Sequence, residues 1–352
     1  MQYTLKEKKP LPKSEYLLVV EIPAEEVVHE QAHVLEHLKK DAEFPGFRKG
    51  FVPEKMIRER TGEMELWEEA ASHALSHVLA KVFRADKLDV IGRPHVEVVK
   101  LSPANPAEFK VTLSLYPSLS LPDYKKISSE HNGKKPESAD IEEKEIDTVV
   151  AEIKKQHEAA TERERGSTEA TRPNGATGKK DFSITDENVK EFGEFATVAD
   201  FRAKVKEGLT SHKAERNREK RRAELLDKLT EKAKGDIPEV LILSELSRME
   251  AELRSQIERM GGTWDAYQKE IKKDAAALHK DWHKDAERRA RLQLVLVEIA
   301  RTEKLNAAPE EVAKEVKHLL EHYKDADPRN AQSYVETLLT NQKVLEFLEG
   351  LK

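Results

Sequence analysis

The sequence contains no cysteine, and this absence excludes several kinds of chemistry. The chain has no disulfide scaffold, no thiol nucleophile and no thiolate ligand for a metal ion. It also has no apolar run of membrane-spanning length, and its first ten residues lack the apolar core of a signal peptide. These absences predict a cytoplasmic protein with no membrane partner.

Aromatic residues and net positive charge are scarce as well. Aromatics make up 6% of the 352 residues, and the formal net charge is −6. Nucleic-acid-binding proteins usually present a basic surface, so we expect no specific DNA partner. The glycines at 46 and 50 lack the Gly-Lys-Ser/Thr ending of a phosphate-binding loop, and no Ser-His-Asp set follows from spacing. We therefore expect no cofactor, no catalytic residues and no nucleotide-driven activity.

Charged residues, in contrast, reach 36% of the chain, which is typical of long, solvated helices. The length suggests two or three domains. Within residues 1–127, strand-like patterns at 17–22, 96–99 and 109–116 flank helical patterns that begin after Pro23 and near Glu63. Strands and helices without regular alternation predict a small α+β domain.

The rest of the chain shows mainly helical patterns. Within residues 128–183 we expect a helix at about 139–160, followed by a flexible linker over 161–180, which has almost nothing apolar to bury. Residues 184–352 predict a mostly α-helical domain. Its patterns include a core helix at 288–301 and further helices near 312–323 and 335–351.

The stretch Phe44–Pro53, Phe-Pro-Gly-Phe-Arg-Lys-Gly-Phe-Val-Pro, predicts a tight loop. Its prolines and glycines do not suit a helix interior or a central strand, and Pro53 fits the first turn of a following helix. Phe47, Arg48 and Lys49 combine a ring with two cations, as in a docking finger. The residues alone are equally consistent with a connecting turn whose phenylalanines fold into the core.

This loop resembles the ribosome-docking signature of bacterial trigger factor, the chaperone family that meets nascent chains at the ribosomal tunnel exit. The matching residues are Gly46, Phe47, Arg48, Lys49, Gly50 and Pro53. The resemblance extends over residues 1–127 and from about 183 to 352. Residues 235–242 and 297–305 are similar to the family's substrate-cradle domain, in which helical arms protrude from a central body.

The resemblance implies an ATP-independent chaperone that binds the large ribosomal subunit and unfolded polypeptides, with a possible homodimer when free. It assigns ribosome binding to the six loop residues. A helical stripe ending at Gly261 is the candidate client surface, although an amphipathic helix normally buries such a stripe against a neighbour. The stripe consists of Leu246, Met249, Leu253, Ile257 and Met260.

One part of the family pattern is missing. Many trigger factors carry a prolyl isomerase domain of the FK506-binding type, which needs roughly 100 residues and an aromatic-lined pocket. Only about 20 polar linker residues stand in its place, so we expect a short form without enzyme activity. Residual isomerase activity, a periplasmic relative and a plain helical scaffold are the alternatives.

The string His29-Glu30-Gln31-Ala32-His33 matches the zinc-protease pattern His-Glu-x-x-His. A helical wheel places Val28, Ala32, Leu35 and Leu38 on the buried side. It leaves His29, His33 and His37 solvated, so we expect no catalytic metal site. Occasional metal binding by this histidine ladder remains open. The pairs His73/His77 and His279/His283 predict solvated faces in the same way.

The run Lys213–Arg222 is rich in cations. Such a run could contact ribosomal RNA, but a charged helix face is more often simply solvated, and we favour the latter.

Overall fold

The computed structural model describes residues 1–352 apart from 42–46, 49, 104, 136, 169–183 and 325. Its described residues form two compact units. One consists of Met1–Pro122 with Leu229–Val344, and the other of Asp123–Lys228 with Leu345–Lys352. Among the described helices, none has the length and apolar character needed to cross a membrane.

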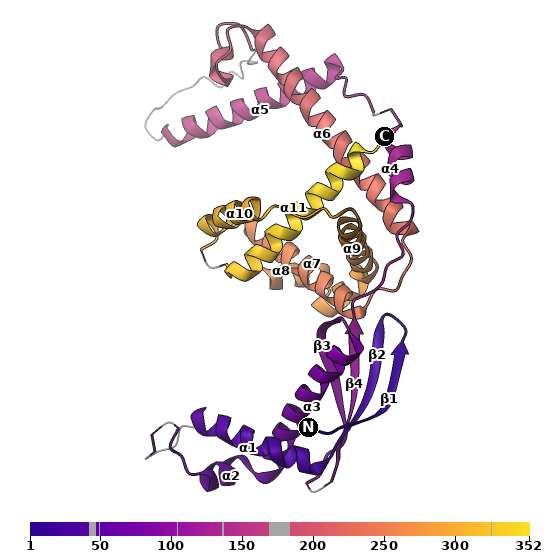
Figure 1. Cartoon of the computed structure of the whole chain (residues 1–352). Coiled ribbons are helices and arrows are strands. Elements are labelled where there is room, and N and C mark those ends of the chain that lie inside the picture. The colour runs from indigo at the N-terminus through magenta and orange to yellow at the C-terminus, as the bar shows by residue number, and fades with distance from the viewer. Residues whose placement is uncertain (42–46, 49, 104, 136, 169–183, 325) are drawn as a thin grey trace. The chain divides into compact units, whose positions relative to one another are not determined.

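The first unit begins with a four-stranded antiparallel sheet and three helices (Figure 1). The strands follow the order β1-β2-β4-β3 across the sheet. This confirms the α+β prediction. The elements are β1 (Thr4–Leu11), β2 (Glu15–Ile22), α1 (Ala24–Asp41), α2 (Glu54–Thr61), α3 (Glu63–Asp86), β3 (Val90–Lys100) and β4 (Ala107–Leu115).

Alternation along the central strands decides which face of the sheet is buried. In β4 every second residue from Ala107 to Leu113 is buried, and in register beside it Leu18 and Val20 of β2 are buried too. Helix α3 contributes the other half of this core, with Leu66, Trp67 and Ala70 among its buried residues. The sequence missed β1 because this edge strand is mostly charged and exposed, as edge strands often are.

The helical wheel predicted for α1 was right for Leu35 and for the half-buried Leu38, but wrong for Val28 and Ala32. Val27 and Val34 are buried together with Leu35, whereas Val28 and Ala32 are exposed. The buried face also takes in Glu30, which contacts histidines of α3. A wheel drawn from apolar residues assigns a glutamate to the solvent, so it cannot find this face.

The helical part of the first unit contains α7 to α10 and most of α11. Leu294 of α9 packs against Ile242 and Leu246 of α7 in a shared core. The predicted 288–301 core lies within α9 and is confirmed, except that Val297 is exposed. The helices are α7 (Glu239–Arg259), α8 (Trp264–Ile271), α9 (Ala275–Glu303), α10 (Pro309–His322) and α11 (Pro328–Gly350).

The second unit contains α4, α5, η1 and most of α6. Helix α5 begins four residues later than predicted and continues through 161–168, the start of the expected linker. The remainder of that linker, 169–183, lies outside the described residues, and α4 was not predicted. The elements are α4 (Tyr124–Asn132), α5 (Glu143–Thr168), η1 (Val189–Phe192) and α6 (Val198–Lys232).

The cations of 213–222 lie on α6, and most residues of this run are exposed, as predicted, although several of the cations also have acidic or carbonyl partners. Lys213 donates to the carbonyl of Asp140 at 2.8 Å, and Lys220 pairs with Glu137 at 2.6 Å. Arg218 and Arg222 pair with Glu349 at 2.9 and 2.6 Å. These side chains hold neighbouring segments of the second unit together.

Candidate functional site

The loop between α1 and α2 ends in a turn that requires glycine. The amide of Phe51 donates to the carbonyl of Arg48 at 2.9 Å, which makes Gly50 the third residue of a four-residue turn. Gly50 has φ +87°, a value that suits the third position of a type II turn and that side-chain-bearing residues rarely adopt. Gly46 and Lys49, two of the predicted docking residues, lie outside the described residues.

The residues after the turn fasten the loop to the domain. Val52 is fully buried in the core of the first unit, between the exposed Phe51 and Pro53. The sequence predicted Pro53 within the first turn of α2. The structure places it one position earlier, as the N-cap of that helix. Its carbonyl accepts from the amide of Met56 at 3.0 Å, so α2 starts directly from the anchored loop.

The tip of the loop exposes large apolar groups beside a cation. Phe47 is 41% exposed and Phe51 is 70% exposed. The guanidinium carbon of Arg48 lies 6.0 Å from the centre of the Phe51 ring, at the outer limit of a cation–π contact. Among the described residues Arg48 has no ion-pair partner. Phe51 was not on the predicted list, although its place beside Gly50 in the same loop could have indicated it.

The cations Arg58 and Lys55 of α2 lie close to acidic side chains. Arg58 donates to Glu54 at 2.9 Å and to Glu63 at 3.3 Å, and these hydrogen bonds raise the pKa of Arg58 above its ordinary value. Lys55 lies 3.9 Å from Glu59. In the described part of this region, Arg48 is therefore the cation best placed for an external partner.

The predicted client stripe on α7 is mostly packed. Leu246 is 2% exposed in the core shared with α9, and Ile257 is buried as well. Met249 and Leu253 are half-buried. Met260, 72% exposed at the end of α7, is the one open member of the stripe. The structure thus separates the stripe into a packed part and an accessible end.

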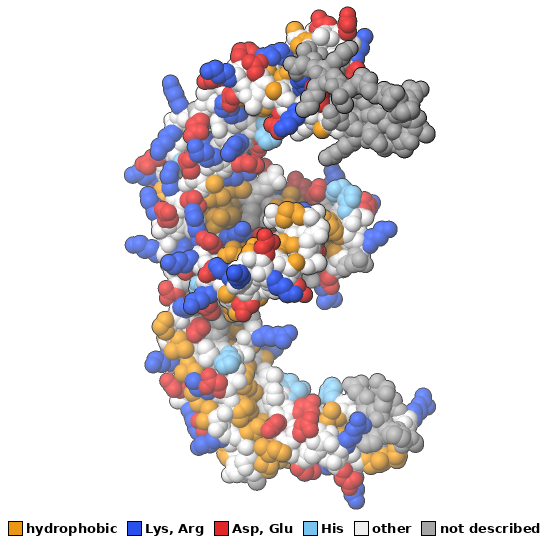
Figure 2. Space-filling view, turned by 180° about the vertical axis from the view of Figure 1, so that it is seen from behind, with side chains coloured by type: hydrophobic (Ala, Val, Ile, Leu, Met, Phe, Trp, Pro, Cys, Tyr) orange, Lys and Arg blue, Asp and Glu red, His pale blue; other side chains and the backbone are white. Residues whose placement is uncertain are grey.

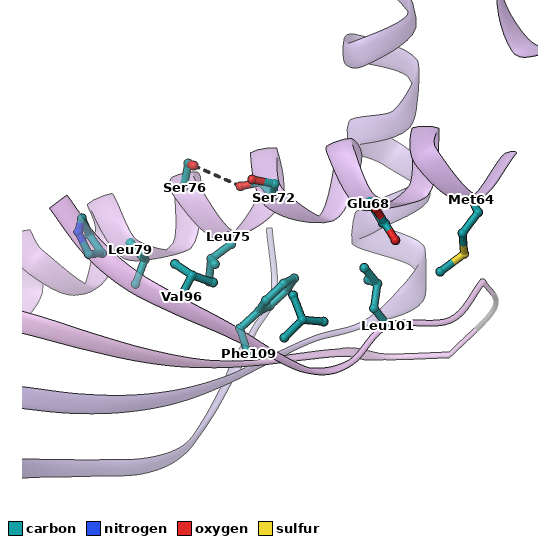
Figure 3. Close-up of a pocket in the computed structure, with 11 residues that line it drawn as sticks. Met64, Glu68, Ser72, Leu75, Ser76, Leu79, Val96, Leu101 and Phe109 are labelled. Carbon is teal, nitrogen blue, oxygen red and sulfur yellow. Dashed lines mark hydrogen bonds between the residues drawn. The ribbon is translucent and has the colours of Figure 1, made fainter. Parts of the chain in front are cut away.

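An apolar groove between α3 and β3 is accessible instead (Figure 3). It has a volume of about 580 Å³. Leu75 and Leu79 of α3 and Phe109 of β4 form a buried floor, and Met64 and Val96 line it with exposed side chains. Figure 3 shows Met64 and Leu75 of α3 extending toward Leu101 and Phe109, which rise from the sheet below. We refer to this surface as the α3–β3 groove.

The sequence analysis did not predict this groove, although two valines of β3 could have indicated it. Val96 and Val98 lie two residues apart and thus on one face of β3, and both are exposed. The strand was predicted, but an open apolar surface on it was not.

A second apolar surface lies along the α10–α11 pair. Tyr323, Tyr334 and Leu338 are exposed there, and they line a groove of about 700 Å³ together with Leu319 and His318. Glu315 and Gln342 line the groove too, so its apolar side chains are bordered by polar ones. On the face of the molecule that Figure 2 shows, apolar side chains are likewise interspersed with acids and bases.

The histidine pairs have mixed environments. His29, His33 and His37 are exposed, as predicted. The pair on α9 is not simply solvated: His279 lies 2.7 Å from Glu250 and His283 lies 3.1 Å from Glu239, both on α7. These contacts between neighbouring helices correct the prediction of a solvated face.

Two family models match the chain. The model of bacterial trigger factor protein covers residues 1–153, and the model of the trigger factor C-terminus covers 197–349. Residues 154–196 between them are too few for an isomerase domain of roughly 100 residues. No enzyme domain is represented by these matches.

Curated relatives and a solved structure agree with the family models. Trigger factor of Halothermothrix orenii is 24% identical, over 98% of this chain and 95% of the relative. Trigger factor of Anoxybacillus flavithermus is also 24% identical, over 87% and 88%. A solved structure from work on promiscuous substrate recognition by the trigger factor chaperone covers 98% of this chain and 100% of its own. Its TM-score is 0.50 at 18% identity, a likeness of fold.

Proposed function

Because this chain belongs to the bacterial trigger factor family of ribosome-associated chaperones, we propose that it docks on the ribosome through the tip formed by Phe47, Arg48, Lys49 and Phe51. One observation carries the proposal: Phe47, Arg48 and Phe51 are exposed next to a glycine-dependent turn and a fully buried Val52. An apolar and cationic tip on an anchored base suits a pocket bordered by acidic side chains or phosphates.

The predicted docking residues Gly50 and Pro53 have supporting roles in this proposal, whereas Gly46, outside the described residues, is assigned to docking by the family resemblance alone. Gly50 permits the turn, and Pro53 starts α2 immediately behind it. Because the tip is small, the contact with the ribosome is local rather than a broad RNA-binding surface. Tethering there raises the effective concentration of each emerging polypeptide, so weak client contacts suffice.

Client binding is assigned to the accessible apolar surfaces: the α3–β3 groove, the α10–α11 surface and Met260. The packed members of the α7 stripe, Leu246 and Ile257, support the helical body instead. Small apolar contacts separated by charge bind an unfolded segment weakly, because ordering the segment offsets much of the burial free energy. Weak binding lets the client leave and fold.

We propose that this activity takes place in the cytoplasm, with the large ribosomal subunit and nascent chains as partners. We infer no prolyl isomerase activity, since residues 154–196 between the two family models are too few for the isomerase domain. The sequence predicts no cofactor. Homodimerisation of the free protein is implied by the family resemblance alone, and sedimentation velocity at several concentrations would measure it.

Aggregation of a chemically denatured client, followed by light scattering without nucleotide, tests the chaperone function. The wild-type protein should suppress scattering, and Val96→Ser/Val98→Ser should suppress it less because the groove loses apolar area. Val99→Ser is the matched control, since Val99 is similarly exposed on β3 but does not line the groove. Equal scattering with and without the wild-type protein, for several clients, would refute the chaperone function.

A further inference from the structure

A buried carboxylate lies among imidazoles where α1 packs on α3. The side chain of Glu30 is only 8% exposed, and each of its oxygens faces histidine. A buried carboxylate needs partners that offset the loss of hydration. Among the described contacts of Glu30, these partners are imidazole nitrogens from both helices.

The α3 side provides the closer contacts. His73 Nδ1 lies 2.7 Å from Glu30 Oε2, and His77 Nε2 lies 3.9 Å from the same oxygen. His73 and His77 are one helical turn apart, with ring centres separated by 4.8 Å. Two histidines at this spacing direct their rings to one side of a helix, an arrangement that zinc-binding helices use.

The α1 side provides a looser set. His29 Nδ1 lies 4.0 Å from Glu30 Oε1, and the rings of His29 and His33 are 5.3 Å apart. All three residues lie on one helix, so this set does not connect α1 to another element. The α3 set is the better candidate because it combines a short contact with ligands from two packed helices.

The donor atoms suit a divalent transition metal. In a tetrahedral zinc site the bonds to nitrogen and oxygen are about 2.0–2.2 Å, which places neighbouring ligand atoms roughly 3.3–3.5 Å apart. The ligand atoms of Glu30, His73 and His77 all lie within 4.8 Å of one another. Small rotations of the two partly exposed imidazoles close this difference. In a chain without cysteine, imidazole and carboxylate are the donors that favour zinc.

We propose that Glu30, His73 and His77 bind one divalent transition metal ion of the zinc class, which links α1 to α3. The fourth position is open to water, as in other sites with three protein ligands. The ion replaces the hydrogen bond between His73 and Glu30 with one metal–ligand bond to each of these residues, and it adds a third bond to His77. It thereby stabilises the helix pair that flanks the docking loop and α2.

Isothermal titration of zinc chloride into the full-length, tag-free and chelator-stripped protein tests the proposal. We expect one ion per chain, and at least a tenfold loss of affinity in His73→Ala/His77→Ala and in Glu30→Gln. His318→Ala/His322→Ala is the matched control. The rings of His318 and His322 also lie 4.8 Å apart, one helical turn from each other, but among the described residues these two histidines belong to neither group of possible metal ligands. This control should bind zinc as the wild type does.

A second variant pair separates the two histidine sets. His29→Ala/His33→Ala should change the affinity less than threefold. An equal or greater loss in this pair would overturn the proposal in favour of the α1 ladder. Affinities that agree within threefold among all variants, or no binding by the wild type, would also overturn it. Circular dichroism and melting without zinc verify folding, and the single variant His77→Ala, at a half-exposed position, repeats the test with least disturbance.

Discussion

Replacing Gly50 with larger residues measures how strongly the turn positions the docking tip. Gly50 has φ +87°, and a Cβ added there meets no atom of the described residues within 4 Å. The substitution Gly50→Ala therefore introduces backbone strain without a clash. A left-handed conformation costs an L-residue roughly 1–2 kcal/mol. Because each 1.4 kcal/mol changes an equilibrium tenfold, the fraction of molecules with the formed turn falls by up to about 5- to 30-fold.

Ribosome affinity should decrease by at most the same factor, because only molecules with the formed turn present Phe47, Arg48 and Phe51 together. Asparagine tolerates this backbone region better than alanine, and β-branched valine tolerates it worst. The dissociation constant should therefore rise from the wild type through Gly50→Asn and Gly50→Ala to Gly50→Val. Titration of fluorescently labelled protein with purified ribosomes measures it.

Gly62→Ala provides the control for this series. Gly62 has φ +88° and equally open surroundings, but it lies between α2 and α3 rather than in the turn. Gly62→Ala should therefore lower the melting temperature without a comparable loss of ribosome affinity. Wild-type affinity in Gly50→Val would refute the idea that this turn positions the tip.

Three further predictions concern the helical parts and the missing domain. Leu246→Ala should lower the free energy of unfolding by about 2–4 kcal/mol in denaturant titrations because the side chain is buried, whereas Met260→Ala, at an exposed position, should change it by less than about 0.5 kcal/mol. Burial opposes ionisation of Glu349, but hydrogen bonds from Arg222 and Arg218 outweigh it and lower its pKa; the resulting stability is present above the unfolded pKa and is lost as pH falls through the folded pKa. Glu349→Gln should thus be less stable than wild type by about 1–2 kcal/mol at pH 7, with the difference vanishing in strong acid, and a constant difference down to pH 2 would contradict this. In a prolyl-peptide assay the protein should leave the uncatalysed rate unchanged, and a rate proportional to protein concentration would reveal an unrecognised isomerase pocket.

The sequence predicted those elements whose pattern follows from one local rule. A short apolar run identified β2, and the apolar pattern of 109–116 identified β4, a strand with one buried face. The proline and glycine positions identified the docking loop, since each of these residues restricts or permits particular backbone angles. The family resemblance rested on the same loop and on motifs in the helical part.

Features that depend on partners distant in the sequence could not be predicted. Glu30 is buried because His73, 43 positions later, supplies its partner. The cations of α6 were assigned to solvent because Glu349 lies 127 positions after Arg222. The α3–β3 groove depends on how a helix and a strand meet, and neither pattern alone indicates that space remains between them.

Co-sedimentation with ribosomes through a sucrose cushion tests the central claim most directly. Phe47→Ala/Arg48→Ala/Lys49→Ala should remain in the supernatant, because it removes the ring and cations of the tip. Lys55→Ala/Glu59→Ala is the control, since it removes a paired cation and acid from the adjacent helix and should pellet with ribosomes like the wild type. The melting temperature of the triple variant should be unchanged, because the substituted side chains belong to an exposed loop. If the triple variant pellets as fully as the wild type, the loop is structural and docking occurs elsewhere.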